Sequence, residues 1–164
     1  MISPRGREVM SQNKKYTSIY ETDIGKISLV SNGTFIERLD FGEVEGEYLS
    51  CPLNDKVALD LENYFKGKLK RFEVPLSPIG TAFQLQVWKA LESIPYGETI
   101  SYKQLAELIG NPKACRAVGM ANNRNPIAIM IPCHRVIGAD GKLVGYGGGL
   151  SIKQYLLELE QRNK

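Results

Sequence analysis

The sequence is poor in the residues that form disulfides and bind metals, with three cysteines and one histidine among 164 residues. An odd number of cysteines without regular spacing argues against a disulfide framework and for a reducing compartment such as the cytoplasm. This set cannot easily supply the four ligands of a structural zinc site, so we expect no metal and no other cofactor. No apolar run is long enough to span a bilayer, so we expect no membrane association.

Acidic residues are missing from part of the chain. Residues 1–78 contain 11 Lys and Arg against 12 Asp and Glu, whereas residues 79–164 contain 10 against 6. No acidic residue occurs between Glu107 and Asp140. A basic window of this kind is usually a solvated helical face, but it also suits a polyanionic partner.

The remaining composition is that of an ordinary globular protein, with 43% hydrophobic and 24% charged residues. Residues 1–15 are polar and basic and lack the apolar segment of a signal peptide, so we expect a polar extension. Between residues 16 and 41, three alternating segments are separated by turn signals at Gly25 and Gly33. This pattern predicts a three-stranded antiparallel meander.

The fold class predicted is α/β, in the α+β sense, with two domains. A helix should run from Asp55 to Phe65, residues 72–76 are a candidate further strand, and the segment Ser77–Gly80 marks a boundary. We therefore expect residues 16–78 to form a small support domain of antiparallel sheet and helix, without a catalytic constellation. Residues 79–164 should form a second, mainly helical domain.

Three helices are predicted at the start of that second domain. The first begins after Thr81 as N-cap and runs to Ile94, and the second covers Ser101–Gly110. Asn111 as N-cap and Pro112 at the first helical position should open the third. Two short helices joined by a Gly-Asn-Pro turn indicate a helix-turn-helix, although packed helix pairs without a DNA role are common.

The third helix carries mostly small side chains. Ala114, Ala117 and Ala121 fall within an arc of roughly 60° at 100° per residue, and Gly119 adds a bare position. Such a helix can approach another surface closely. That surface is either a neighbouring helix or a nucleic-acid groove, with Arg116 as the projecting side chain.

The segment Pro132-Cys133-His134-Arg135 follows the apolar run 127–131, which we predict to be a buried strand ending in a tight turn. A cysteine acts as a nucleophile through its thiolate and needs a base or a positive charge beside it. His134 and Arg135 are the candidates. The alternative is a structural cysteine that happens to precede a surface histidine.

The last predicted helix starts near Ser151 and places Glu160 on its apolar arc. A carboxylate on an apolar face needs a partner, and His134 is the only imidazole, although Arg162 is an alternative. Lys153 shares the arc, and we expect its long stem to extend outward to solvent. Before this helix, the glycine-rich stretch 138–149 contains Tyr146, which suits either the wall of a site for a flat ligand or a flexible surface loop.

Several of these motifs together resemble the O6-alkylguanine-DNA alkyltransferases (methylated-DNA–protein-cysteine methyltransferases). The resemblance covers residues 80–160 nearly continuously, and residues 16–76 only loosely. The segments that carry it are Gly80-Thr81-Ala82-Phe83-Gln84, Val87-Trp88, Ile94-Pro95-Tyr96-Gly97-Glu98-Thr99, Ser101-Tyr102, Asn111–Gly119, Asn125-Pro126, Pro132–Ile137 and Gly145–Leu150.

The resemblance implies DNA repair by a suicide reaction, in which Cys133 accepts the alkyl group of O6-alkylguanine and is spent. In this family the histidine acts through a bridging water and the glutamate holds the histidine, which assigns these roles to His134 and Glu160. Asn125 matches the hinge asparagine. The target base is buried in a duplex, so it has to be flipped out.

The resemblance also implies how the DNA is held. Arg116 would fill the place of the flipped base, and Tyr102 would crowd the phosphate. The helix with Ala114, Ala117 and Gly119 would lie in the minor groove, with Cys115 near the DNA face. The implied partner is double-stranded DNA containing O6-alkylguanine, bound by a monomer that is cytoplasmic or associated with nucleoid or nuclear DNA.

By the same resemblance, the hydroxyl of Tyr102, the backbone of Cys133 and Val136 and the amide of Gly147 would hold the guanine, with Tyr146 as a wall. Two departures concern this pocket: Gly147 stands where some members have Ser, and Ala128 replaces a proline.

Two alternative functions remain from the sequence. One is a non-catalytic alkyltransferase-like lesion binder, in which the nucleophile is commonly replaced by Trp. The other is a cysteine hydrolase with a Cys/His pair, which would turn over. The hydrolase hypothesis leaves Arg116, Tyr102 and the helix pair unexplained.

Overall fold

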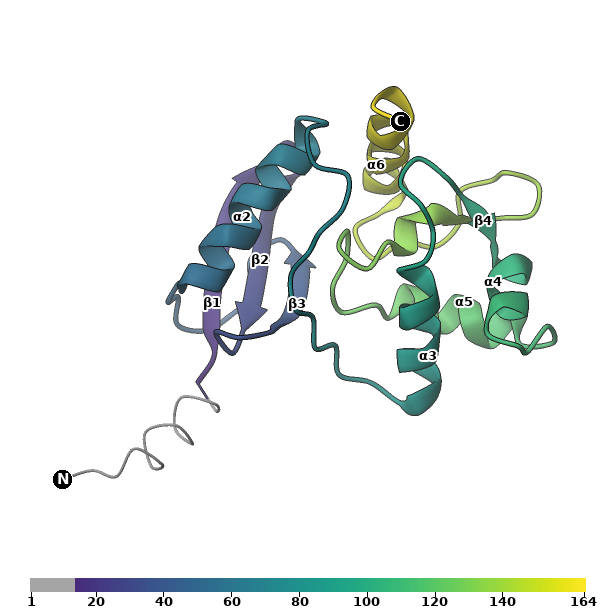
Figure 1. The fold of residues 1–164 in the computed structure, drawn as a ribbon, viewed down its shortest axis with the longest axis horizontal. Helices are drawn as coiled ribbons and strands as arrows, with labels where there is room; N and C mark the ends of the chain where they lie inside the picture. Colours follow the sequence, from purple (N-terminus) through teal and green to yellow (C-terminus); the bar gives the residue numbers. More distant parts are fainter. Residues whose placement is uncertain (1–13) are drawn as a thin grey trace.

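The computed structural model describes residues 14–164; the predicted extension 1–15 therefore lies almost wholly outside the described residues. The N-terminal part is a three-stranded antiparallel sheet of order β1-β2-β3, with helix α2 on one face (Figure 1). The strands are β1 (Tyr16–Thr22), β2 (Gly25–Ser31) and β3 (Ile36–Phe41). Thr22 pairs with Gly25 at the first hairpin, where a φ of 99° favours glycine. The predicted meander is confirmed.

Helix α2 (Pro52–Phe65) begins three residues earlier than predicted, because Pro52 fits the first helical turn and Cys51 is the N-cap. The helix buries one apolar face that includes Val57, Leu61 and Tyr64. These side chains belong to the core cluster that also contains the inward residues of the sheet.

The predicted strand at residues 72–76 is wrong. Only an isolated bridge joins Leu76 to Ile36. The carbonyl of Pro75 accepts from the amide of Ile36 at 2.9 Å, but Pro75 has no amide hydrogen with which to continue a ladder.

The second half is helical, as predicted, and the α/β class with a helix pair is confirmed (Figure 1). Its elements are α3 (Ala82–Leu91), β4 (Ile100–Ser101), α4 (Tyr102–Leu108), α5 (Cys115–Asn123), the 3-10 helix η1 (Cys133–Arg135), β5 (Val136–Ile137) and α6 (Leu150–Arg162). Strands β4 and β5 pair in parallel. Thr81 and Ser101 each start a helix with a complete capping box, which is why α3 and α4 begin where they do.

Several predicted helix ends in this half differ from the structure, including those of α4, which spans Tyr102–Leu108 and not Ser101–Gly110. Helix α5 starts at Cys115, because Asn111 and Pro112 form a preceding turn in which the carbonyl of Asn111 accepts from Ala114 at 3.0 Å. Helix α3 ends at Leu91, not at Ile94. Helix α6 starts at Leu150, after Gly149 at a φ of 97°, and not after Ser151.

The predicted strand at residues 127–131 is also wrong, although all five residues are buried as expected. The segment coils into turns, in which the carbonyl of Ile127 accepts from Ile131 at 3.0 Å and Ile129 has a φ of 71°. Apolarity indicates burial but does not distinguish a strand from a buried turn. A bridge from Leu39 to Ile127 attaches this segment to β3.

No helix between residues 14 and 164 is long and apolar enough to cross a membrane.

Candidate active site

Cys133 is the first residue of η1, and its side chain is 5% exposed. One asparagine in the last turn of α5 and one just after this helix hold the segment around Cys133. Asn125 donates to the carbonyl of Ile131 at 2.7 Å, and Asn122 donates to the carbonyl of Cys133 at 3.3 Å. The position of the thiol is therefore fixed relative to the C-terminal end of α5.

His134 is fully buried and forms a hydrogen bond from Nε2 to Oε2 of Glu160 at 2.7 Å, as the sequence predicts. An ionised carboxylate can only accept, so this contact assigns the proton to Nε2 and leaves Nδ1 with a free lone pair. Nδ1 is buried and has no hydrogen-bond partner among residues 14–164. The imidazole is thus oriented as a base on its Nδ1 side.

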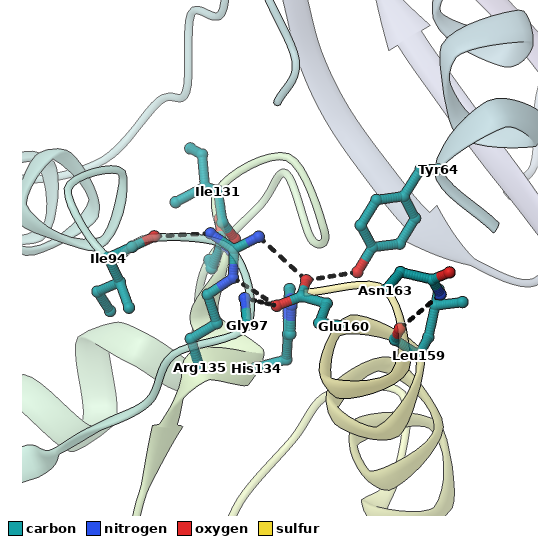
Figure 2. A network of polar contacts seen from close by, with 10 residues as sticks. Tyr64, Ile94, Gly97, Ile131, His134, Arg135, Leu159, Glu160 and Asn163 are labelled. Atoms are coloured by element: carbon teal, nitrogen blue, oxygen red, sulfur yellow. Dashed lines mark hydrogen bonds and ion pairs between the residues drawn. The ribbon is translucent and has the colours of Figure 1, made fainter. Parts of the chain in front are cut away.

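Glu160 is the centre of a larger network than the sequence indicates (Figure 2). Arg135 donates from Nε to Oε1 at 2.8 Å and from Nη2 to Oε2 at 3.0 Å. The hydroxyl of Tyr64 donates to Oε2 at 2.6 Å, and the amide of Gly97 donates to Oε1 at 3.3 Å. The alternative partner, Arg162, does not contact Glu160. Sequence reasoning missed Arg135 as a ligand of this carboxylate, and no local signal points to Tyr64.

The pKa values of His134, Glu160 and Cys133 follow from burial and from these contacts. Burial is the largest influence on each group. It lowers the pKa of His134 below its ordinary value, although Glu160 acts in the opposite direction. Burial alone would raise the pKa of Glu160, but the hydrogen bond from His134 and the hydrogen bonds and charge of Arg135 outweigh it and keep that pKa below its usual range. A neutral imidazole therefore faces an ionised carboxylate.

Burial raises the pKa of the Cys133 thiol to about 11, while a hydrogen bond from Asn125 and the charge of Lys153 act in the other direction. The resting side chain is accordingly a thiol at neutral pH. Reaction through the thiolate then requires a base to accept the proton.

Lys153 does not extend to solvent, so that expectation is wrong. The side chain is fully buried, and Nζ donates to the carbonyls of Val136 at 2.6 Å and Val144 at 2.8 Å. Burial lowers its pKa to about 8, with Cys133 acting against this. The two carbonyl acceptors lower the free-energy cost of burying the ammonium, which the sequence does not show. The position of Lys153 on the apolar arc of α6 was the feature of the sequence that indicated its burial.

Tyr102 is the first residue of α4, and its hydroxyl donates to the carbonyl of Val144 at 3.1 Å. Its ring lies against α5: a Cβ atom on Gly119 would be 3.7 Å from it. Burial raises the pKa of Tyr102. The helix pair is thereby joined to the glycine-rich loop before α6.

The predicted DNA-facing residues of α5 lie on its open side. Cys115, Arg116 and Ala117 are exposed, and Ala114 and Gly119 are half-buried. Ala121, which shares their arc in the sequence, is buried instead, and its carbonyl accepts from the indole of Trp88 at 2.9 Å. The small residues of α5 are thus partly exposed, as at Ala117, and partly buried in the core, as at Ala121.

A groove of about 650 Å³ opens beside Cys133, between β3 and the segment 122–128. Tyr146 and Gly147 line it from the glycine-rich loop, and Phe41 of β3 packs against Tyr146 with ring centroids 5.7 Å apart. The hydroxyl of Tyr146 is buried without a partner among residues 14–164. Val136 is buried, and its carbonyl is occupied by Lys153. Of the pocket residues named from the sequence, Tyr146 and Gly147 therefore line the groove beside the thiol, whereas Val136 and Tyr102 do not line it.

Within residues 14–164, no cluster of three or more His, Cys, Asp or Glu side chains is arranged to hold a metal ion.

Two parts of the chain match models of the 6-O-methylguanine DNA methyltransferase. The ribonuclease-like domain matches residues 15–78, and the DNA-binding domain matches residues 82–162. A methylated-DNA–protein-cysteine methyltransferase of Methanosarcina barkeri is 54% identical over 155 residues, covering 90% of this chain and 98% of that protein. The protein of that name from Mycobacterium tuberculosis strain H37Rv is 50% identical over 147 residues, covering 86% and 89%.

Solved structures of methyltransferases have a fold similar to that of this chain. A crystal structure of the M. tuberculosis O6-methylguanine methyltransferase superposes with a TM-score of 0.84 at 45% identity, covering 92% of this chain and 95% of that one. A crystal structure of M. tuberculosis OGT in complex with DNA gives a TM-score of 0.83 at 47% identity, covering 91% and 93%. This chain belongs to the 6-O-methylguanine DNA methyltransferase family.

Proposed function

We propose that this protein repairs DNA directly, by transferring the alkyl group of O6-alkylguanine in double-stranded DNA to the sulfur of Cys133. The observation that carries the proposal is the buried Glu160–His134 pair, which leaves Nδ1 unprotonated on the residue that directly follows Cys133, whose buried thiol lines a groove. Family membership supplies the substrate class.

The reaction is a single displacement. The Cys133 proton passes through a bridging water to Nδ1 of His134, which is the basic side of the ring because Glu160 holds the proton of Nε2. The thiolate forms a bond to the alkyl carbon, and the bond from that carbon to O6 breaks. The electron pair goes to the guanine, which takes up one proton and becomes the ordinary base. No redox partner is needed.

The product at Cys133 is a thioether with no good leaving group, so each chain reacts once. A buried, neutral thiol suits such a protein, because the pKa of about 11 keeps the side chain unreactive until the substrate is in place. Asn125 is proposed as the hinge that holds the active-site turn to α5.

DNA is the proposed partner of α4 and α5, with α5 in the minor groove. Arg116 is exposed, with Ala117 next to it and the half-buried Ala114 and Gly119 nearby, which suits close approach to a duplex. Arg116 would fill the gap left by the flipped base, and Tyr102 at the start of α4 would press on the phosphate. Cys115 lies beside Arg116 on this face.

The flipped guanine would enter the groove beside Cys133. Three of the four buried side-chain polar atoms without partners in residues 14–164 belong to Asn122, His134 and Tyr146, all at this site. Unpaired buried groups are rare and usually have a functional reason. We propose that the base is held by Tyr102, by the backbone of Cys133 and Val136 and by the amide of Gly147, with Tyr146 as a wall.

A monomer is proposed, in the cytoplasm or associated with the DNA of the nucleoid or nucleus. The lesion-binder alternative is not favoured, because Cys133 is present with its base. A Cys-His hydrolase would not use the exposed Arg116 face.

The test is incubation with duplex DNA that carries radiolabelled O6-methylguanine. We expect one label per chain, located at Cys133 by peptide mass, and no turnover with excess substrate. Cys133→Ala should bind the DNA and take no label, whereas Cys51→Ala, at the start of α2, should be labelled like the wild type. Repeated turnover, or a label on another residue, would refute the proposal.

A further inference from the structure

Tyr64 connects the N-terminal domain to the candidate active site. It lies in the last turn of α2 and is fully buried, and its hydroxyl donates to Oε2 of Glu160 at 2.6 Å across 96 positions of sequence (Figure 2). Three aromatic neighbours surround its ring: Phe65 and Phe72 at 5.5 Å and Tyr96 at 6.2 Å between centroids. The hydroxyl is thus aimed at the carboxylate by a packed core.

Tyr64 and His134 donate to the same carboxylate oxygen. His134 Nε2 lies 2.7 Å from Oε2, and Nη2 of Arg135 is a third donor at 3.0 Å. Each donor withdraws negative charge from that oxygen. The proton affinity of the imidazole depends on this charge, because a carboxylate stabilises the imidazolium more strongly when fewer other groups bind it.

We propose that Tyr64 is a positioning residue of the active site, whose hydroxyl holds Oε2 of Glu160 and limits the negative charge that the carboxylate offers to His134. The inference rests on the proposed function, in which His134 is the base. The N-terminal domain, which carries no reacting group, would in this way adjust the proton transfer from Cys133.

The direction in which Tyr64 changes the proton affinity of His134 follows from the groups around the Glu160–His134 pair. Burial and the nearby Glu160 raise the pKa of Tyr64 well above its ordinary value, so the phenol stays a neutral donor at all working pH values. The titratable and charged groups around Glu160 and His134 are Tyr64 from α2, Tyr96 from the loop after α3, Arg135 from η1, Tyr146 from the loop before α6, and Lys153 from α6. Cys133 precedes His134 in the chain. Among residues 14–164, only Tyr64 and Arg135 share Glu160 with the imidazole through side-chain hydrogen bonds.

The chain offers a matched control for this hydroxyl. Tyr155 of α6 also joins the two domains through a carboxylate, with its hydroxyl donating to Asp23 at 3.3 Å, but it does not contact Glu160. Tyr155→Phe therefore removes a tyrosine–carboxylate bond between the domains and leaves the active-site network intact.

The experiment is a proton NMR titration of the imidazole in full-length protein. His134 is the only histidine in the chain, so its ring signal needs no assignment. In Tyr64→Phe we expect the midpoint to rise by about 0.5 to 1 pH unit, while Tyr155→Phe leaves it unchanged. The acidic limb of the pH–rate profile for alkyl transfer should move to higher pH by the same amount.

An unchanged midpoint in folded Tyr64→Phe, or an equal shift in Tyr155→Phe, would overturn the proposal and leave Tyr64 a packing residue. The titration reads the imidazole directly, so it gives an answer even if Cys133 accepts no alkyl group.

If Tyr64→Phe does not fold, the wild-type protein provides a second measurement. With the tyrosines labelled at Cζ, one of the eight signals should shift with the midpoint of His134, since coupling between two sites is reciprocal. If no tyrosine signal follows the imidazole, the proposal is wrong.

Discussion

The ammonium of Lys153 lies 2.6 Å from the carbonyl oxygen of Val136, three residues beyond Cys133 in the chain. A fully buried cation is unusual and is retained here by two carbonyl acceptors. Its charge favours the thiolate of Cys133 over the thiol.

Replacing Lys153 with Met should slow alkyl transfer by about tenfold or more, because loss of the cation raises the pKa of the thiol further and a unit of pKa changes the thiolate fraction tenfold. The measurement is the second-order rate with methylated duplex at pH 7. Lys142→Met is the control, since that lysine side chain is 81% exposed. Equal rates in the wild type and Lys153→Met would remove Lys153 from the chemistry.

The stability of the fold should fall as the pH is lowered from 7 to 5. The pKa of His134 is lower in the folded chain than in the unfolded one, so the unfolded chain binds the proton first as the pH falls through about 6.5. The free energy of unfolding then decreases by up to about 1.4 kcal/mol per pH unit for this one group.

Urea unfolding at pH 7.0, 6.0 and 5.5 measures this slope. The chain has no second histidine that could produce it. Stability that is constant or increases toward pH 5.5 would contradict a buried, neutral His134.

Glu160→Gln should slow transfer by roughly 10- to 100-fold, because the amide no longer fixes the proton on Nε2 of His134. The change also leaves the buried guanidinium of Arg135 without its counter-ion, at a cost of about 3–5 kcal/mol. Rates must therefore be compared at a temperature where circular dichroism shows the variant to be folded. An unchanged rate in folded protein would exclude Glu160 from the mechanism.

Arg116→Ala should reduce repair of the duplex much more than reaction with the free base O6-methylguanine, since the arginine is proposed to replace the flipped nucleotide. Both rates are measured with the same preparation. Lys113→Ala, on the exposed turn before α5, serves as a charge control. Equal losses on both substrates would argue against the role in base flipping.

The sequence predicted the features that depend on local chemistry. Turn glycines separated the strands, and Thr81 marked a helix start as an N-cap. The partnership of Glu160 with His134 followed from the helical arc and from the single histidine.

The errors arose where tertiary contacts replace local preference. Residues 127–131 are apolar enough for a strand but coil into turns between β3 and η1. Lys153 is buried because two distant carbonyls meet its ammonium. Tyr64 reaches Glu160 only because two parts of the chain 96 residues apart pack together, and no spacing in the sequence predicts that contact.

The bridge between Leu39 and Ile127 couples the unfolding of the sheet to that of the active-site turn. The amide of Leu39 donates to the carbonyl of Pro126 at 2.9 Å, so the sheet ends directly on the segment that Asn125 holds. Buried residues of both halves also form one core cluster. Melting of the sheet would therefore expose the active-site turn, and we expect calorimetry to record one cooperative transition for the whole described chain, with no separately melting half.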